Sequence, residues 1–401
     1  MFKNFSVVLT RDGLVTLINF VISIILANYW DKNIVGIWFS LQAIFFVFDS
    51  LFRYKSEPLM LLLYKSGKNN RALGSQFVIA FISIVIFVII SFVFSSYALT
   101  KAALLGTDIS IVDYVAFCSW VIMSIGGTTY LYYCLRDRTF TRYNFFILFQ
   151  ATTNLGLIVF STYFQFKSLT TFLLIQCMIW LPLFIIYIFA LIKNLSFTAS
   201  KDIINLFQGG LYFYFSSIMA ATHLNFPRLY ATYYLTKEDV AEIGFLFIFG
   251  ALLMKVPAAI NVVFLPQAKE GYKISDRFNL IKTFIVFLIV IHLLFAFLGN
   301  FLVTTFLAET YYQLGPLLVN LIPAFLFYNV AIILSTQLNL IGNYKAMLAA
   351  SVIALTIQIL VSILFSPSYQ AIFYSYYCYS ITYFAIIGFV FYIRLRNEAF
   401  L

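Results

Sequence analysis

The sequence between His223 and Lys269 reads HLNFPRLYATYYLTKEDVAEIGFLFIFGALLMKVPAAINVVFLPQAK. Two long apolar segments meet here at a short polar turn, residues 235–239 (LTKED). Each segment carries one strong base, Arg228 in the first and Lys255 in the second. A base inside a membrane helix costs about 2.5–3.5 kcal/mol on insertion scales, so helices rarely keep one without a function. The stretch therefore predicts two membrane helices, joined by a hairpin, that contribute to a basic cavity.

The composition of the whole chain also indicates membrane helices. Of its 401 residues, 63% are hydrophobic and only 10% are charged, and the mean hydropathy is +0.97. Soluble domains carry about 25% charged residues, so a soluble core does not explain this chain. A membrane-spanning helix needs about 20 apolar residues, and this length therefore holds about twelve of them. We expect an all-α polytopic membrane protein.

The apolar runs give twelve expected spans. They lie at roughly 12–30, 34–54, 76–97, 112–134, 144–164, 169–192, 204–233, 240–265, 279–304, 314–338, 346–366 and 371–394. An even number of spans places both termini on one side of the membrane. Of the 25 Lys and Arg residues, two lie within spans and only four lie in loops on the side away from the termini: Lys32, Lys101, Lys167 and Lys237. Positively charged loops stay inside, so both termini are predicted to be cytoplasmic.

The chain also contains a faint internal repeat. Residues 33–39 (NIVGIWF) open the second expected span, and residues 241–247 (AEIGFLF) open the eighth. Each follows a tyrosine-rich helix end and a lysine-containing hairpin. The offset is about half the chain, which predicts an N-terminal lobe at 1–200 and a C-terminal lobe at 201–401, each with six helices. Two halves with an even number of helices form a parallel repeat, related by an axis along the membrane normal.

Polar residues recur at helical spacing inside several spans, so each set lies on one helix face. Such stripes are expected on the walls of a watery cavity, and polar contacts between packed helices are the alternative. The members are Asp12, Thr16, Asn19 and Ser23 in the first span, Gln42, Asp49, Arg53 and Ser56 in and after the second, and Gln150, Asn154 and Ser161 in the fifth.

The charged members of these stripes allow two interpretations. Asp49 is a candidate for proton or sodium coupling, because acids within membrane helices mark ion paths. Asp49 and Arg53 are also one helical turn apart and could simply neutralise each other. Lys255 lies too far from the hairpin for its ammonium to reach the interface easily, whereas Arg228 could extend outward. The two histidines, His223 and His292, are far apart in the sequence, and helix packing is their expected role.

No enzyme motif is present in the sequence. There is no phosphate-binding loop, no nucleophile elbow and no H-x-x-x-H pair. We therefore expect no catalytic residues, no cofactor and no metal. Transport through this chain alone would take its energy from an ion gradient, the membrane potential or the substrate gradient.

The chain resembles a known family. It looks like a Wzx-type O-antigen or polysaccharide flippase of the multidrug/oligosaccharidyl-lipid/polysaccharide (MOP) exporter superfamily. The likeness extends over nearly the whole chain through short motifs: residues 29–38 (YWDKNIVGIW), 240–245 (VAEIGF), 264–268 (FLPQA), 309–312 (ETYY) and 340–345 (LIGNYK).

The resemblance implies a MATE-like pair of six-helix lobes around a cationic cleft in a bacterial cytoplasmic membrane. The implied substrate is an undecaprenyl-pyrophosphate-linked oligosaccharide, moved from the cytoplasmic to the outer leaflet by alternating access. A polysaccharide polymerase and a chain-length regulator are implied as further partners. Arginine and lysine would offset the desolvation of the pyrophosphate. On this basis the headgroup ligands are Arg11, Arg53, Arg228 and Lys255, and the sugar-facing wall is Thr16, Asn19, Gln42, Gln150 and Asn154.

Two other functions remain as alternatives. An O-antigen polymerase has a similar composition but characteristically carries a large outer loop, whereas the expected outer loops here have about a dozen residues or fewer. A drug or cation exporter of the same superfamily would need acidic cavity residues. The charges expected within the membrane are mainly basic, with Asp49 the exception, and this favours an anionic headgroup.

Overall fold

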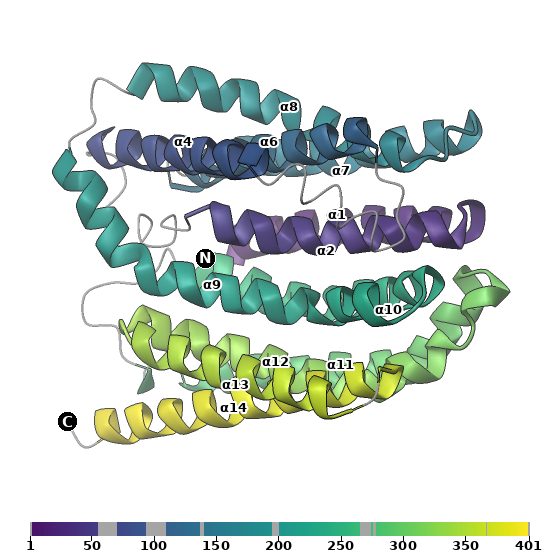
Figure 1. Cartoon of the computed structure of the whole chain (residues 1–401). Helices are drawn as coiled ribbons and strands as arrows, with labels where there is room; N and C mark the ends of the chain where they lie inside the picture. Colours follow the sequence, from purple (N-terminus) through teal and green to yellow (C-terminus); the bar gives the residue numbers. More distant parts are fainter. Residues whose placement is uncertain are drawn as a thin grey trace. The chain divides into compact units, whose positions relative to one another are not determined.

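The computed structural model describes residues 2–54, 70–93, 110–136, 140–194, 200–264, 274–275, 278–365 and 367–399. Within them the chain forms twelve α-helices and one short 3-10 helix, η4 (Glu309–Tyr311) (Figure 1). The α-helices are α1 (Phe2–Tyr29), α2 (Lys32–Phe52), α4 (Asn70–Val93), α6 (Ile111–Arg136), α7 (Phe140–Tyr163), α8 (Leu169–Asn194), α9 (Ser200–Tyr234), α10 (Lys237–Phe264), α11 (Phe278–Phe306), α12 (Leu314–Leu340), α13 (Tyr344–Leu364) and α14 (Tyr369–Ala399). Residues 265–268 of one family motif lie outside the described ranges.

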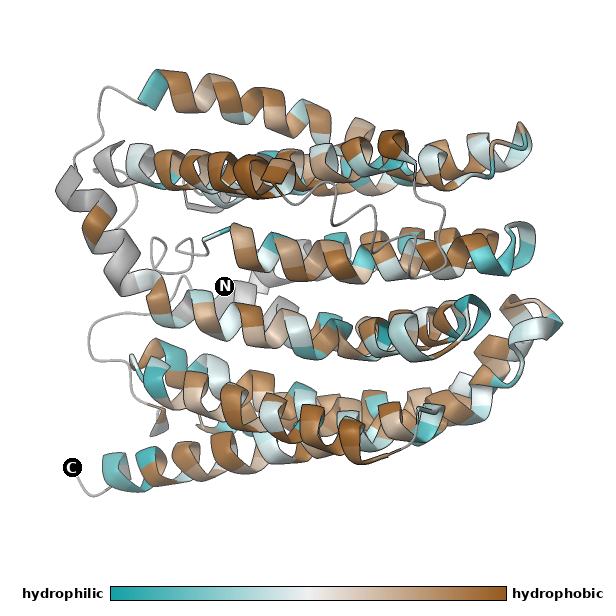
Figure 2. Ribbon diagram, viewed as in Figure 1, coloured by the Kyte–Doolittle hydropathy of each residue, from teal (hydrophilic) through white to brown (hydrophobic). Residues whose placement is uncertain are grey.

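Eleven of these helices, in the described part of the chain, are long and apolar enough to cross a membrane. They match eleven of the twelve expected spans, and the remaining expected span, 204–233, is the continuous helix α9. Figure 2 shows apolar residues distributed along the length of the helices. Large apolar side chains are left outside, for example Phe92 at 82% and Phe297 at 84% exposure. Lipid rather than water suits such surfaces, and the prediction of an all-helical polytopic membrane protein is confirmed.

The chain divides into two compact units. One consists of Gly13–Ala221, and the other combines Met1–Asp12 with Thr222–Leu401. The division at residue 221 lies within α9, whereas the sequence predicts a lobe boundary at 200/201. That these units act as the two moving lobes of a transporter remains a prediction.

Two similar hairpins, one in each unit, show how the sequence sets local structure. Before α2, the Asp31 carboxylate accepts hydrogen bonds from the backbone N–H groups of Asn33 (2.9 Å) and Ile34 (3.2 Å). Before α10, Asp239 and Thr236 cap each other: the Thr236 hydroxyl donates to Asp239 (2.7 Å), and the Asp239 N–H donates to the Thr236 hydroxyl (3.2 Å). Such caps satisfy backbone donors that the helix leaves free, so each helix begins at its hairpin.

Aromatic stacking and close helix contacts form the core of the unit Gly13–Ala221. Trp38 of α2 stacks on Trp120 of α6 (ring centroids 5.4 Å apart) and on Phe172 of α8 (4.9 Å). Helices α6 and α8 pack closely at Gly126, where an added Cβ would lie 2.7 Å from the Tyr187 ring. Glycine is needed here because any side chain would push the two helices apart.

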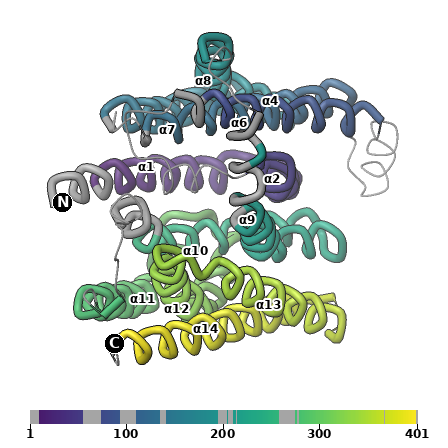
Figure 3. The backbone as a smooth tube through the Cα atoms, turned by 90° about the vertical axis from the view of Figure 1, so that its left-hand side faces the viewer, coloured from purple at the N-terminus to yellow at the C-terminus, as the bar shows by residue number. Residues whose placement is uncertain are grey.

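The unit that contains Thr222–Leu401 is built around α12, which packs on α10, α11 and α14. Helices α13 and α14 lie side by side, as both views show (Figures 1 and 3). Gly250 of α10 lets the ring of Phe325 on α12 come so close that a Cβ at Gly250 would overlap it. Pro257 and Pro323 lie within α10 and α12, and both helices continue through them.

Candidate functional site

Two charged side chains at the beginning of α1 lie within electrostatic range of a lysine on α10. Arg11 and Asp12 form an ion pair, with the Arg11 Nη2 atom 2.6 Å from Asp12 Oδ1 and its Nε donating to the same oxygen at 2.9 Å. Lys255 of α10 lies within electrostatic range of both residues, attracted by Asp12 and repelled by Arg11. We call Arg11, Asp12 and Lys255 the basic cluster. With two cations and one anion it keeps a formal charge of +1.

The three members of the basic cluster differ in exposure. Arg11 is only 5% exposed, whereas Lys255 is classed as exposed although it lies well inside α10. The Arg11 guanidinium is paired with Asp12, and Lys255 is the more exposed residue of the two bases. The family resemblance implied Arg11 and Lys255 as headgroup ligands, and the structure places them within electrostatic range of each other although they are 244 positions apart in the chain. Asp12 was noted only as part of a polar stripe.

Arg228 lies in α9, in the same compact unit as the basic cluster. Its side chain is half-buried, and its backbone carbonyl accepts a hydrogen bond from the Thr232 hydroxyl (2.7 Å). Pro227 precedes it inside the helix. Its role as a headgroup ligand stays a prediction.

Asp49 and Arg53 of α2 form an ion pair in the other unit. The Arg53 Nη2 atom lies 3.3 Å from Asp49 Oδ2, and both side chains are about nine-tenths buried. The Ser124 hydroxyl of α6 donates to the second carboxylate oxygen, Asp49 Oδ1, at 3.2 Å. The sequence allowed this pairing as one of two interpretations. Ser124 was not predicted, because nothing distinguishes it from the other small polar residues of its helix.

The expected polar wall also lies in the unit Gly13–Ala221, in several environments. The Thr16 hydroxyl and the Gln150 amide nitrogen are buried without a hydrogen-bond partner among the described residues, whereas Asn19 is exposed. The oxygen of Asn154 accepts a hydrogen bond of 3.4 Å from Gln176 of α8. Gln42 is half-buried in α2. The contact of Asn154 fits helix packing, and the unsatisfied atoms at Thr16 and Gln150 fit a wet wall.

Both histidines lie in contacts between helices. Nδ1 of His223 is 2.9 Å from Oε1 of Gln358 on α13, and the imidazole stacks on Tyr379 of α14 with ring centroids 3.3 Å apart. Nδ1 of His292 donates to the Leu288 carbonyl (2.8 Å), so its Nε2 accepts from the Asn329 amide (3.1 Å). Because a carbonyl only accepts, these partners assign the proton of His292 to Nδ1 and leave the ring neutral.

Among the residues that the structure describes, no group of three or more His, Cys, Asp or Glu side chains could hold a metal ion. Two of the charged groups in the described helices are therefore the basic cluster in one unit and the Asp49–Arg53 pair in the other. The basic cluster can attract an anion, and the Asp49–Arg53–Ser124 group can bind or release a cation only by giving up an existing contact.

No protein-family model matches the sequence, and no curated protein is significantly similar to it. Solved structures are similar to the chain over its whole length. A MATE structure in the straight conformation matches with a TM-score of 0.69 and 10% identity, covering 100% of this chain and 96% of that one. The lipid II flippase MurJ, in an inward closed conformation, matches with a TM-score of 0.62 and 17% identity, covering 97% of this chain and 86% of that one.

An inward-facing multidrug resistance MATE transporter of the MOP superfamily is also similar, with a TM-score of 0.62 and 10% identity over 98% of both chains. These neighbours are transporters of one superfamily, and at such identities the likeness shows the fold. The expectation of a MATE-like helical architecture is therefore confirmed. The chain has the fold shared by MATE transporters and the MurJ flippase.

Proposed function

We propose that this protein is a flippase for lipid-linked oligosaccharides. It moves undecaprenyl-pyrophosphate-linked O-antigen or polysaccharide repeat units from the cytoplasmic to the outer leaflet of a bacterial cytoplasmic membrane, by alternating access. Both termini lie in the cytoplasm, and a polymerase and a chain-length regulator act on the product. The Wzx-type identity belongs to this proposal.

The basic cluster is the observation that carries the proposal. It combines Arg11, Asp12 and Lys255 on the apolar helices α1 and α10, and Lys255 is its most exposed member. Where water is scarce the effective dielectric constant falls, and a cation then interacts much more strongly with a pyrophosphate. The uncharged sugars need only hydrogen-bonding groups, and the lipid tail can stay in the bilayer. Arg53 and Arg228 are further proposed headgroup ligands.

The fold adds support, because one of the similar proteins is itself a lipid II flippase. Energy for transport would come from an ion gradient, with Asp49 as the proposed coupling residue. Asp49 forms an ion pair with Arg53, and a bound proton or sodium ion would replace Arg53 as its partner.

A drug or cation exporter is the second candidate, favoured by the likeness to a multidrug resistance MATE transporter. Such a protein binds cations, which the +1 charge of the basic cluster opposes. A polymerase is a third candidate and would be an enzyme, whereas the similar structures are transporters.

The experiment is deletion of the gene in its host, followed by assay of the leaflet in which single lipid-linked repeat units accumulate. We expect them on the cytoplasmic face. Complementation with Lys255→Ala should leave at least a tenfold accumulation, and Lys255→Arg should relieve most of it. Lys345→Ala is the matched control, since Lys345 is an exposed lysine at the start of α13.

Single units on the outer face without polymer would instead indicate a polymerase. A normal glycan profile with altered drug tolerance would indicate the exporter. Either result would contradict the proposal.

A further inference from the structure

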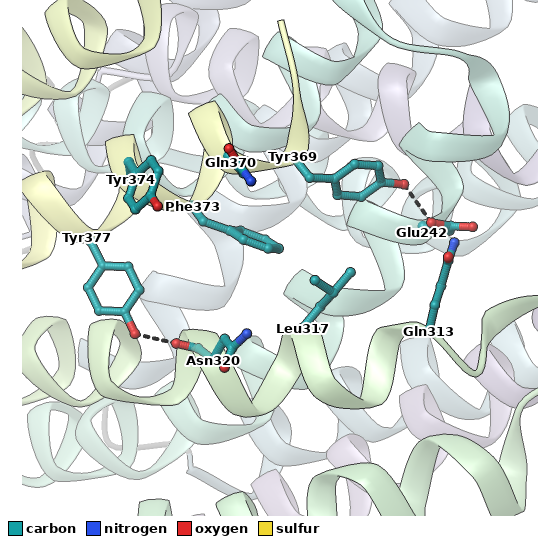
Figure 4. Close-up of a pocket in the computed structure, with 9 residues that line it drawn as sticks. All are labelled: Glu242, Gln313, Leu317, Asn320, Tyr369, Gln370, Phe373, Tyr374 and Tyr377. Atoms are coloured by element: carbon teal, nitrogen blue, oxygen red, sulfur yellow. Dashed lines mark hydrogen bonds between the residues drawn. The ribbon is translucent and has the colours of Figure 1, made fainter. Parts of the chain in front are cut away.

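A pocket lies at the end of the Thr222–Leu401 unit where α10, α12 and α14 begin (Figure 4). Its volume is about 650 Å³, within the roughly 300–1,000 Å³ typical of small-molecule sites. This is the end at which the hairpin 235–239 lies, and the predicted topology places that end outside the cell. None of the residues that line the pocket belongs to the basic cluster or was predicted as a site residue.

Two helix faces form most of the pocket wall. Gln313, Leu317 and Asn320 follow one another at spacings of four and three along the start of α12, so they lie on one face. Tyr369 and Phe373, one helical turn apart at the start of α14, lie opposite them. The Tyr377 hydroxyl donates to the backbone carbonyl of Asn320 and joins the two helices.

The third side of the pocket comes from α10 and is acidic. Glu242 is 2% exposed, and its Oε2 lies 2.5 Å from the Tyr369 hydroxyl. The same hydroxyl lies 3.0 Å from Asp239 Oδ1 in the hairpin. These contacts fix the Tyr369 ring at the edge of the pocket. Two carboxylates at this end also give the pocket a negative potential.

The lining is rich in neutral groups that both donate and accept hydrogen bonds. Three carboxamides are the exposed side chains of Gln313, Asn320 and Gln370, and each offers two N–H donors and one oxygen acceptor. Tyr374 adds a hydroxyl and, with Phe373, an aromatic face. A sugar presents this same combination, with hydroxyls that donate and accept around a ring whose C–H faces pack on aromatic rings.

The charges decide which part of the proposed cargo fits. Among the described residues that line the pocket none is basic, so a phosphate or pyrophosphate would meet only the negative potential of Glu242 and Asp239. A carboxylate can still accept hydrogen bonds from sugar hydroxyls. The pocket lining contains three exposed carboxamides, whereas its carboxylate, Glu242, is buried. This lining favours a polyhydroxylated, uncharged ligand over a cation.

We propose that this pocket is a saccharide-binding site, which holds the sugar part of the lipid-linked cargo at the outer end of the Thr222–Leu401 unit. The inference rests on the proposed flippase function. Sugar binding here would retain the repeat unit after it has crossed and would hinder its return. The pyrophosphate would meanwhile remain outside the pocket, because none of the described lining residues carries a positive charge to pair with it.

The test is photo-crosslinking in membranes of the producing host. Phe373 is replaced by p-benzoylphenylalanine, a substitution of one aromatic ring by a larger one, and the protein is analysed by intact mass after irradiation. The matched control is the same replacement at Phe389, which lies on the same helix and is 64% exposed. A third protein carries the probe at Met254, beside Lys255 of the basic cluster, and reports on the proposed function itself.

We expect an adduct with the mass of the host's lipid-linked repeat unit at Phe373 and Met254 and none at Phe389. It should vanish in a host that cannot add the first sugar. The double substitution Gln370→Ala/Asn320→Ala, at two exposed positions, should lower the Phe373 adduct at least threefold and leave the Met254 adduct unchanged.

A saccharide adduct at Met254 without one at Phe373 would overturn the pocket assignment and leave the flippase standing. No saccharide adduct at either position would overturn both proposals. A Phe373 photoproduct without sugar mass that is suppressed by tetraphenylphosphonium would show a cation site and also refute the assignment.

Discussion

Replacing Asp49 by asparagine tests the buried ion pair of α2. The carboxylate lies 3.3 Å from Arg53, and each side chain is only about 10% exposed. Removing one partner of a buried pair costs about 3–5 kcal/mol, because the other charge keeps its desolvation penalty. Arg53 is the C-cap of α2, where the helix dipole stabilises a cation by about 0.3–1 kcal/mol. We therefore expect the lower end of that range, about 3 kcal/mol.

The matched double variant, Asp49→Leu/Arg53→Met, separates stability from transport. Replacing both members of a buried pair by apolar residues is often neutral or stabilising. We expect its free energy of unfolding to lie within about 1 kcal/mol of the wild type, while Asp49→Asn loses about 3 kcal/mol, on the order of 10²-fold in the folded-to-unfolded ratio. If Asp49 couples transport to an ion, the double variant folds and still fails to export repeat units.

Equilibrium unfolding in detergent, followed by tryptophan fluorescence, gives the stabilities, and complementation of the deletion strain at matched expression gives transport. Trp120 lies in the same helix as Ser124, so its emission reports on this region. Restored export by the double variant would refute the coupling role of Asp49. A loss below 1 kcal/mol for Asp49→Asn would refute the ion-pair energetics.

Substitutions at Gly250 and His292, whose neighbours Phe325 and Asn329 lie on α12, test the packing of that helix. Gly250→Ala should lower the free energy of unfolding by about 1–3 kcal/mol, because the new methyl group overlaps the Phe325 ring. The control Gly156→Ala lies inside α7 with no neighbour within 4 Å and should raise the free energy of unfolding by up to about 1 kcal/mol, because alanine is the better helix former. Equal unfolding midpoints of the two variants would contradict this. His292→Gln should retain stability and export, since an amide oxygen can replace the imidazole nitrogen that accepts from Asn329. His292→Leu should lower the free energy of unfolding by about 1–3 kcal/mol, because it leaves the Asn329 amide without this acceptor. The same unfolding assay checks both variants, and loss of export in a stable His292→Gln protein would assign the ring a role in transport.

Local sequence was sufficient to predict the helices of this chain. In a bilayer every backbone polar group must be satisfied within the segment, so an apolar run of about 20 residues can only be a helix. The hairpins were equally local, since Asp31 and the Thr236–Asp239 pair cap the helices that follow them. Helical spacing also allowed the Asp49–Arg53 contact as one of two interpretations, because residues one turn apart lie on the same face.

The contacts between distant residues depended on the tertiary structure. Packing of the helices brings Ser124 to Asp49, places Lys255 within electrostatic range of Arg11, and brings together the starting turns of α10, α12 and α14 that line the pocket. Phe, Ile and Leu side chains can pack against one another in many combinations. In a chain that is 63% hydrophobic, the sequence therefore says little about which helix lies beside which. The sequence alone determined that the chain is a bundle of membrane helices that carry bases. Side-chain shape, as at Gly126 and Gly250, decided which helices pack closely, because close packing is specific where hydrophobicity is not.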